Sequence, residues 1–186
     1  MKRLVWVFVL LIFLIGCSSK EQGIDGALTF RKQLLASSNC QFDAVVTADY
    51  SDRVYTFAMT CQADADGKVT FTVTSPETIR GITGYLDGNG GALTFDDQIL
   101  AFPKMADGQI TPVSAPWILI KTLRGGYLSA CEDIKNGHRL TINDSYEENA
   151  MQLIIETDSE HIPTGAEVFW KGQRILTIQV SNFTMQ

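Results

Sequence analysis

Apolar and polar residues alternate along the chain from residue 42 to residue 75, as they do in strands that have one buried face. Two alternating stretches, 42–48 and 54–60, flank the turn-like cluster at 49–52. A third stretch, 68–75, places two valines and a phenylalanine on one side and threonines on the other. This pattern predicts a β-hairpin followed by a third strand.

Short apolar stretches separated by glycine, proline, asparagine and aspartate continue to the end of the chain. They predict further strands at 78–86, 92–95, 98–102, 127–131, 139–142, 151–157, 166–170 and 174–183. Residues 103–112 are expected to form an irregular connection. Many short strands with regular turns indicate a sandwich or a barrel. The sequence therefore predicts a mainly β domain of about eleven mostly antiparallel strands.

Two segments have helical rather than strand periodicity. The first, at 26–38, carries an apolar stripe formed by Leu28, Phe30, Leu34 and Leu35, and its basic residues are expected to face water. This stripe predicts a short helix that covers one side of the strands.

The second helix is expected at 114–125, where Ser114 suits the N-cap, Pro116 the first turn and Gly125 the position after the last turn. Apolar residues occupy almost every side of this helix: Trp117, Ile118, Leu119, Ile120 and Leu123. Such a helix is either buried in the core or lines a cavity for a hydrophobic ligand. The pattern leaves both interpretations open.

The N-terminus has the organisation of a secretory signal peptide, with two basic residues, an apolar run at 4–15 and small residues at its end. The run is shorter than the roughly 20 apolar residues of a membrane-spanning helix. The sequence Leu14-Ile15-Gly16-Cys17 resembles the lipobox of bacterial lipoproteins. This resemblance implies that residues 1–16 are removed and that Cys17 is lipidated. It places the protein at the extracytoplasmic face of the cell membrane.

The expected domain organisation follows from this processing. Residues 17–25 would form the lipidated N-terminus and a flexible tether, and residues 26–186 a single domain. The chain has 15 basic and 21 acidic residues, and loss of Lys2 and Arg3 leaves 13 basic residues and a net charge of −8. No basic cluster remains in the processed chain, so nucleic acid is not an expected partner.

Neither of the two motifs that suggest a cofactor or a metal is complete. The glycine-rich loop at 87–91 lacks the lysine of a phosphate-binding loop. The loop at 64–67 has two aspartates but lacks the third acidic ligand and the closing glutamate of a calcium site. Both are expected to be strand turns, and no cofactor or metal is expected.

Three cysteines lie beyond the lipobox, and the strand pattern suggests how two of them pair. If Ala48 lies opposite Arg53 in the first hairpin, Cys40 falls opposite Cys61 on the apolar face. This register predicts a Cys40–Cys61 disulfide and leaves Cys131 free. Disulfides are common in exported proteins. Two buried thiols are the alternative.

The order of the elements resembles that of the outer-membrane lipoprotein carrier superfamily, the LolA/LolB-like fold: a helix, a six-strand meander, an apolar helix and five more strands. The stretches Ser114-Ala115-Pro116-Trp117, Tyr146-Glu147-Glu148 and Arg174-Ile175-Leu176 are also similar to lipoproteins of clostridia-like bacteria. The resemblance implies an incomplete barrel covered by one or two helices, with an apolar cavity that holds acyl chains. The membrane anchor of this chain distinguishes it from the soluble carriers.

An enzymatic function is not expected. The chain has two histidines, His138 and His161, and lacks a Gly-x-Ser-x-Gly motif and a pair of His or Cys residues at metal-ligand spacing. Cys131 could act as a nucleophile with either histidine, but a cysteine within a strand is more often a small core residue.

Two functional hypotheses remain. The first is a membrane-tethered binding module for a lipid or another hydrophobic ligand, and its candidate cavity lining is Tyr55, Phe57, Phe71, Trp117, Ile118, Leu119, Ile120 and Trp170. The second is an envelope protein-interaction or assembly factor without a small ligand, such as a spore-germination accessory lipoprotein, which uses a sheet edge or a concave face. The first requires an apolar cavity, and the second a filled core with an exposed apolar patch.

The lipobox interpretation predicts the effect of one substitution. Cys17→Ala should leave the chain uncleaved or release it from the membrane, because this thiol would carry all of the lipid. Fractionation of cells followed by mass spectrometry of the N-terminus measures both outcomes. A variant that is still cleaved and still bound to the membrane would contradict lipidation at Cys17.

Overall fold

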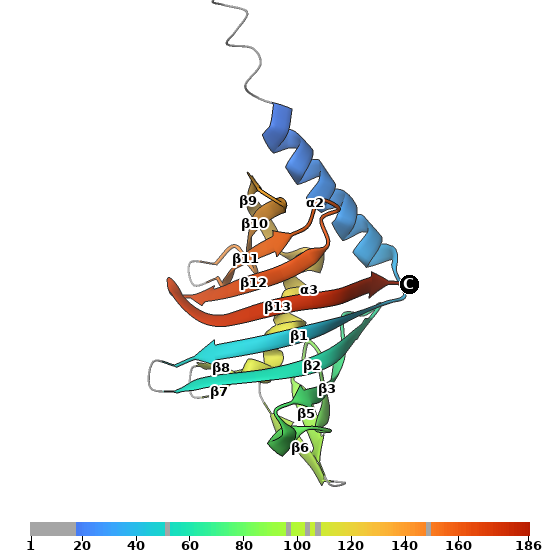
Figure 1. The fold of residues 1–186 in the computed structure, drawn as a ribbon, viewed down its shortest axis with the longest axis vertical. Coiled ribbons are helices and arrows are strands. Elements are labelled where there is room, and N and C mark those ends of the chain that lie inside the picture. Colours follow the sequence, from blue (N-terminus) through green and yellow to red (C-terminus); the bar gives the residue numbers. More distant parts are fainter. Residues whose placement is uncertain (1–17, 51–52, 96–97, 103–104, 107–108, 148–149) are drawn as a thin grey trace, which may run out of the picture.

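An antiparallel sheet of eleven strands forms the frame of the molecule (Figure 1). The structure is a computed structural model, and it describes residues 18–50, 53–95, 98–102, 105–106, 109–147 and 150–186. The strands of the first half are β1 (Asn39–Asp49), β2 (Val54–Asp64), β3 (Val69–Ser75), β4 (Thr83–Leu86), β5 (Gly91–Phe95) and β6 (Gln98–Phe102). Those of the second half are β9 (Tyr127–Ile134), β10 (Gly137–Asn143), β11 (Gln152–Thr157), β12 (Pro163–Trp170) and β13 (Gln173–Met185).

The remaining elements of the described residues are two α-helices, two short 3₁₀ turns and a small hairpin. They are α2 (Ser18–Ala36), η1 (Glu77–Ile79), β7 (Met105–Ala106), β8 (Gln109–Ile110), η2 (Pro112–Ser114) and α3 (Ala115–Gly125). The strand order is β6-β5-β4-β3-β2-β1-β13-β12-β11-β10-β9, so each half is a meander and the first strand pairs with the last. The sheet is open at β6 and β9. The mainly β, incomplete-barrel class predicted from the sequence is confirmed.

One face of the sheet is buried and the other is exposed to solvent, as the alternation of residues predicts. The buried residues of β1 and β2 are Cys40, Phe42, Ala44, Val46, Ala48, Phe57, Met59, Cys61 and Ala63. We call this side the inner face. The predicted apolar helix is confirmed as α3, and it packs on the inner face against β2, β3, β10 and β13. Ser114 precedes α3, but its side chain makes no capping hydrogen bond.

The predicted tether is the largest difference between expectation and structure. Residues 18–25 belong to α2 rather than to a flexible segment. Polar residues such as glutamate, lysine and glutamine form helices readily, so the polar composition of this segment did not distinguish a tether from a helix. The two glycines of this region, Gly23 and Gly26, lie where α2 approaches Cys131 and His161 most closely.

The buried face of α2 also differs from the predicted stripe. Ala27, Phe30 and Leu34 are buried, whereas Leu28 and Leu35 are 41% and 49% exposed. Positions three or four residues apart share one face of a helix, and the glycines extend this face toward the N-terminus. A stripe chosen by residue type alone therefore included two leucines from the opposite side.

The first hairpin has a register two residues away from the predicted one. Cys40 lies opposite Ala63, and Cys61 lies opposite Phe42. The hairpin extends by one further pair, because the Tyr50 N–H donates a hydrogen bond to the Arg53 carbonyl oxygen at 3.0 Å. A shift by two residues keeps every side chain on its predicted face, so the apolar pattern could not distinguish the two registers.

The predicted Cys40–Cys61 disulfide is consequently wrong. Cys40, Cys61 and Cys131 are buried free thiols in the structure. Burial raises the pKa of the Cys40 thiol to about 11 and also raises the pKa of Cys61. Both sulfurs therefore stay protonated at neutral pH, and the alternative of two buried thiols holds.

Two local expectations also need correction. Residues 78–86 are not one strand, because η1 and a turn with Gly81 at φ +88° precede β4. Part of the predicted irregular connection forms the β7–β8 hairpin. Within the described residues, neither α2 nor any other helix has the length and apolar character needed to cross a membrane.

The observed register predicts where a disulfide can be introduced. Ala63→Cys should place a thiol directly opposite Cys40, and oxidation should then link positions 40 and 63. In the unmodified chain, thiol labelling after denaturation without a reductant should modify Cys40, Cys61 and Cys131. Peptide mapping under non-reducing conditions measures both results. A link between Cys40 and Cys61 in either protein would contradict the register.

Candidate functional site

The structure separates the eight residues that the sequence suggested as a cavity lining. Six are buried within the hydrophobic core: Phe57, Phe71, Trp117, Ile118, Leu119 and Ile120. Tyr55 is 46% exposed near the end of the first hairpin, and Trp170 is half-buried at the end of β12. The core thus brings the α3 residues together with Phe57 and Phe71 but not with Tyr55. A ligand among these residues stays a prediction.

Helix α3 is fixed between the two meanders by backbone-directed hydrogen bonds as well as by packing. Arg31 of α2 donates from Nε to the Leu123 carbonyl oxygen at 2.7 Å, and burial lowers the pKa of its guanidinium. Arg124, at the end of α3, donates to the carbonyl oxygen of Ala65 in the turn after β2. These contacts satisfy carbonyl groups at the helix end and in a turn, and they join α2, α3 and the first meander.

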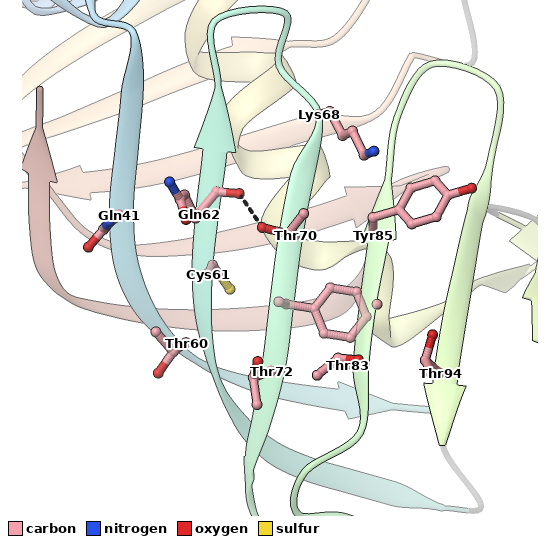
Figure 2. A pocket seen from close by; sticks show the side chains of 12 residues that line it. Gln41, Thr60, Cys61, Gln62, Lys68, Thr70, Thr72, Thr83, Tyr85 and Thr94 are labelled. Carbon is pink, nitrogen blue, oxygen red and sulfur yellow. Dashed lines mark hydrogen bonds between the residues drawn. The ribbon is translucent and has the colours of Figure 1, made fainter. Parts of the chain in front are cut away.

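The outer face of the first meander is polar. A shallow groove of about 470 Å³ lies on β1–β5. Figure 2 shows that threonine, glutamine and lysine side chains form most of its lining. Thr60, Thr72, Thr83 and Thr94 lie directly opposite one another on β2, β3, β4 and β5. Threonine suits an exposed strand because its branched side chain fits the pleat while its hydroxyl reaches water. Among the described residues, the titratable groups that line this groove are Lys68, Tyr85 and the Cys61 thiol, which burial keeps protonated.

Exposed apolar residues lie on both faces of the last two strands of this meander. Ile99, which lies opposite Thr94 on the outer face, is 76% exposed. Leu100 lies opposite Leu93 on the inner face and is 66% exposed, and Phe95 at the end of β5 is 50% exposed. We call Leu93, Phe95, Ile99 and Leu100 the apolar margin.

Phe95, Ile99 and Leu100 are exposed, and Leu93 is half-buried, because the principal helix contacts lie elsewhere on the sheet. Helix α2 packs mainly on β9, and α3 packs on the central strands β2, β3, β10 and β13. Among the residues that the structure describes, strand β6 pairs only with β5 and forms one edge of the eleven-stranded sheet. Apolar residues on both faces of an edge strand constitute an unusual surface for a protein in water. This surface is our candidate site for a partner.

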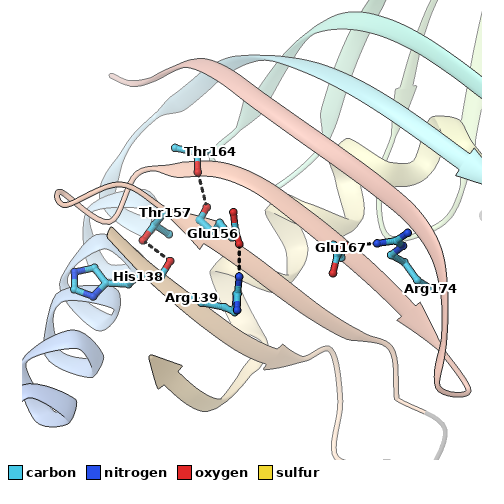
Figure 3. Close-up of polar contacts among 7 residues, drawn as sticks. All are labelled: His138, Arg139, Glu156, Thr157, Thr164, Glu167 and Arg174. Carbon is cyan, nitrogen blue, oxygen red and sulfur yellow. Dashed lines mark hydrogen bonds and ion pairs between the residues drawn. The ribbon is translucent and has the colours of Figure 1, made fainter. Parts of the chain in front are cut away.

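A second cluster lies at the other side of the sheet, beneath the N-terminal half of α2. The rings of His138 and His161 are stacked with centroids 4.2 Å apart and an angle of 8° between their planes. His138 Nδ1 lies 3.0 Å from Asp133 Oδ1, and Figure 3 shows His138 beside the pale blue helix. Cys131 Sγ lies so close to α2 that a Cβ at Gly23 would be 2.7 Å away.

This histidine cluster is built for packing rather than for catalysis. Burial is the largest cause that raises the pKa of the Cys131 thiol, followed by Asp133 and Glu132, so a reactive thiolate is disfavoured. A Cβ at Gly26 would overlap the His161 ring, so the ring occupies the space left by the missing side chain. In the part of the chain that the structure describes, no three His, Cys, Asp or Glu side chains could hold a metal ion together.

Sequence reasoning recognised the cysteine and the two histidines but not their contacts. Cys131 and His161 are separated by 30 positions, and the neighbouring strands β9, β10 and β11 bring them under one helix. The two glycines of α2 were the available signal, because glycine within a helix often marks a close approach of another group. The apolar margin was visible only as the two predicted strands 92–95 and 98–102.

No family model matches the chain, and neither does any curated protein. Among solved structures, the chain is similar to an uncharacterised conserved protein from Thermus thermophilus, with 13% identity, a TM-score of 0.49 and coverage of 88% of this chain and 87% of the other. A LolA superfamily protein from Nitrosomonas europaea has 11% identity, a TM-score of 0.44 and coverage of 86% and 93%.

A third similar structure is the complex of the CwlD amidase with the GerS lipoprotein from Clostridioides difficile, with 14% identity, a TM-score of 0.42 and coverage of 91% and 97%. These proteins share few residues with this chain and superpose on it with scores below 0.5. No binding property passes from them to this chain on that basis.

The histidine cluster predicts how stability depends on pH. Burial and the neighbouring His138 lower the pKa of His161 below its usual value of 6.5, and Asp158 only partly opposes them. Below pH 6.5 the unfolded chain therefore binds more protons than the folded chain, and stability should fall as the pH falls. Thermal unfolding at pH 7.5 and pH 5.5 measures this loss.

A matched variant separates His161 from the carboxylates that also titrate. His161 has a positive φ of 64°, which asparagine tolerates better than most residues. His161→Asn should therefore fold and should lose less stability than the unmodified chain between pH 7.5 and pH 5.5. An equal loss in both proteins would rule out His161 as the source.

Proposed function

We propose that this chain is a non-enzymatic binding module, held at the extracytoplasmic face of the cell membrane by lipid on Cys17. The apolar margin binds an extended, apolar segment of another envelope protein. The lipobox supports the location, and the surface of β5 and β6 supports the activity. The proposal corresponds to the interaction-factor hypothesis rather than to the hydrophobic-ligand hypothesis.

The observation that carries this proposal is the character of β6. Its sequence, Gln98–Phe102, contains no charged residue, and Ile99 and Leu100 expose apolar side chains on opposite faces. Proteins commonly protect an edge strand with charges, bulges or covering elements, because its free N–H and C=O groups can pair with another strand. A partner strand added here would form main-chain hydrogen bonds and bury apolar side chains on both faces.

The net charge favours a different protein over a second copy of this chain. The processed chain has a net charge of −8, so pairing two copies would bring like charges together. A partner that is neutral or basic near its binding segment avoids this repulsion. The absence of a charge on β6 lets apolar contacts determine the interaction once the partner has approached.

A hydrophobic ligand is the second candidate, and one observation favours it. Leu93, Phe95 and Leu100 lie on the inner face of the margin, beyond the central strands that α3 covers. An acyl chain could lie along these residues without using the backbone edge. Native mass spectrometry of the purified chain distinguishes the candidates, since a lipid adds a defined mass that a strand-binding protein does not require.

The protein-partner proposal predicts a position-specific crosslink. A photoreactive phenylalanine analogue in place of Ile99 should crosslink one defined envelope protein in intact cells, because this side chain is 76% exposed beside the open edge. Adding Leu100→Lys should reduce the crosslinked product at least tenfold, because the partner would have to bury a charge. Mass spectrometry of the adduct identifies the partner segment.

Val54→Lys is the matched control for this experiment. Val54 is 64% exposed at the start of β2, so a lysine there adds the same charge to an apolar strand position outside the margin. The crosslink should survive this substitution. Equal losses with Leu100→Lys and Val54→Lys, or an adduct that contains lipid alone, would contradict the proposed protein partner.

A further inference from the structure

A groove of about 740 Å³ opens at the ends of β9–β12, and neither function considered so far uses it. Its wall residues include Tyr127, Asn143, Tyr146, Gln152 and Phe169. We call these five residues the aromatic–amide groove. The groove lies beside the β9 edge of the sheet, whereas the apolar margin lies at the β6 edge.

Strand pairing aligns four of these residues in one row. Tyr127 lies opposite Asn143, Asn143 opposite Gln152, and Gln152 opposite Phe169. Their neighbours Ile142 and Leu153 are buried on the inner face, so alternation places this row on the outer face. Three strand spacings separate the two ends, which is roughly 14 Å. The row therefore has an aromatic residue at each end and two amides between them.

The aromatic residues present ring surface to solvent. Tyr127 is 48% exposed and Tyr146 is 87% exposed, and their rings contact each other with centroids 5.0 Å apart. The face of an aromatic ring carries partial negative charge and attracts the partly positive C–H groups on the face of a sugar ring. Two rings at one end and Phe169 at the other provide such surfaces.

The two side-chain amides between the rings form one hydrogen bond with each other, and this bond uses only some of their donors and acceptors. Gln152 Nε2 donates to Asn143 Oδ1 at 3.3 Å. Among the described residues, the Asn143 amide nitrogen and the Gln152 amide oxygen make no further side-chain hydrogen bond. The row therefore keeps free N–H donors on Asn143 and a free acceptor oxygen on Gln152. A hydroxyl group, which both donates and accepts, matches this pair.

The charges around the groove favour a neutral ligand. Its described lining contains one acid and one base, Glu147 and Lys171. The next charged residues on the same outer face are already paired: Arg139 with Glu156 at 2.7 Å, and Arg174 with Glu167 at 2.5 Å (Figure 3). A polyanion would in addition be repelled by the acidic chain as a whole.

The segment that presents Tyr146 is tied to the sheet at its base. The Asp144 N–H donates to the Met151 carbonyl oxygen at 2.9 Å, and Asp144 Oδ1 accepts from the Met151 N–H at 2.8 Å. The Nζ atom of Lys121, on α3, also lies 3.4 Å from Asp144 Oδ2. These contacts hold Asp144, two residues before Tyr146, in place on the sheet, which limits the entropy lost on binding.

We propose that the aromatic–amide groove binds a neutral oligosaccharide. The ring faces stack on the sugars, and Asn143 and Gln152 hydrogen-bond to hydroxyl or acetamido groups between them. A ligand in this row crosses four strands and meets their side chains, so it would not lie along a strand as a peptide added to a sheet edge does. The site is separate from the apolar margin, so this inference does not depend on the proposed function.

Titration of the full-length chain with a tetramer of N-acetylglucosamine tests the proposal, in a detergent that lacks a sugar headgroup. Isothermal calorimetry should show saturable binding, and a glucose tetramer serves as a second neutral probe. Tyr127→Ala should weaken binding at least tenfold, and so should Gln152→Leu, which keeps the approximate shape but removes the amide. Tyr146→Ala should also weaken binding. This variant should still fold, because the Tyr146 side chain is 87% exposed.

Tyr85→Ala is the matched control. Tyr85 is a 39% exposed tyrosine on the same outer face, but it lies on β4 and contacts Lys68 outside the groove. Binding should be unchanged in this variant. The proposal is overturned if neither tetramer binds, if Tyr85→Ala weakens binding as much as the groove variants do, or if an extended peptide binds at the groove and the sugars do not displace it.

Discussion

Pairing between the first strand and the last strand holds this molecule together. Residues 40–48 of β1 pair with residues 176–185 of β13, and this ladder is the junction between the two meanders of the sheet. Each meander alone would expose one apolar face, and α3 can be buried only when both contribute to the inner face. The junction brings chain ends together across almost the whole sequence, so its loop-closure entropy must be offset by the core that it completes.

The sequence was informative wherever a local pattern determines the structure. The strand at 98–102 and the apolar helix at 114–125 were located correctly, because strand alternation and helix-terminating residues are local signals. The register of the first hairpin was wrong because a shift by two residues preserves both faces. The length of α2 was wrong because its N-terminal half is held by contacts with β9, which no local pattern reveals.

The same distinction separates what could be predicted about the sites. Trp117 and its neighbours in α3 were recognised as apolar on all sides, but only the fold assigns them to the core. The exposed margin depends on which strand becomes the edge of the sheet, and the aromatic–amide row depends on four pairings between strands. When strands far apart in the sequence bring residues together, the spacing of those residues in the sequence does not predict the contact.

The helical start of the domain has a mechanical consequence. The described part of α2 spans Ser18–Ala36, next to the proposed lipid-bearing Cys17, and its 19 residues correspond to a rod of roughly 28 Å. Because this helix packs closely on Cys131 of β9 at Gly23 and on His161 at Gly26, the lipid would be attached to a rigid element rather than to a flexible segment. Figure 1 shows the start of α2 and strand β6 at opposite ends of the long axis. A rigid helix in this position would hold the apolar margin away from the bilayer, where it can contact proteins farther from the membrane surface.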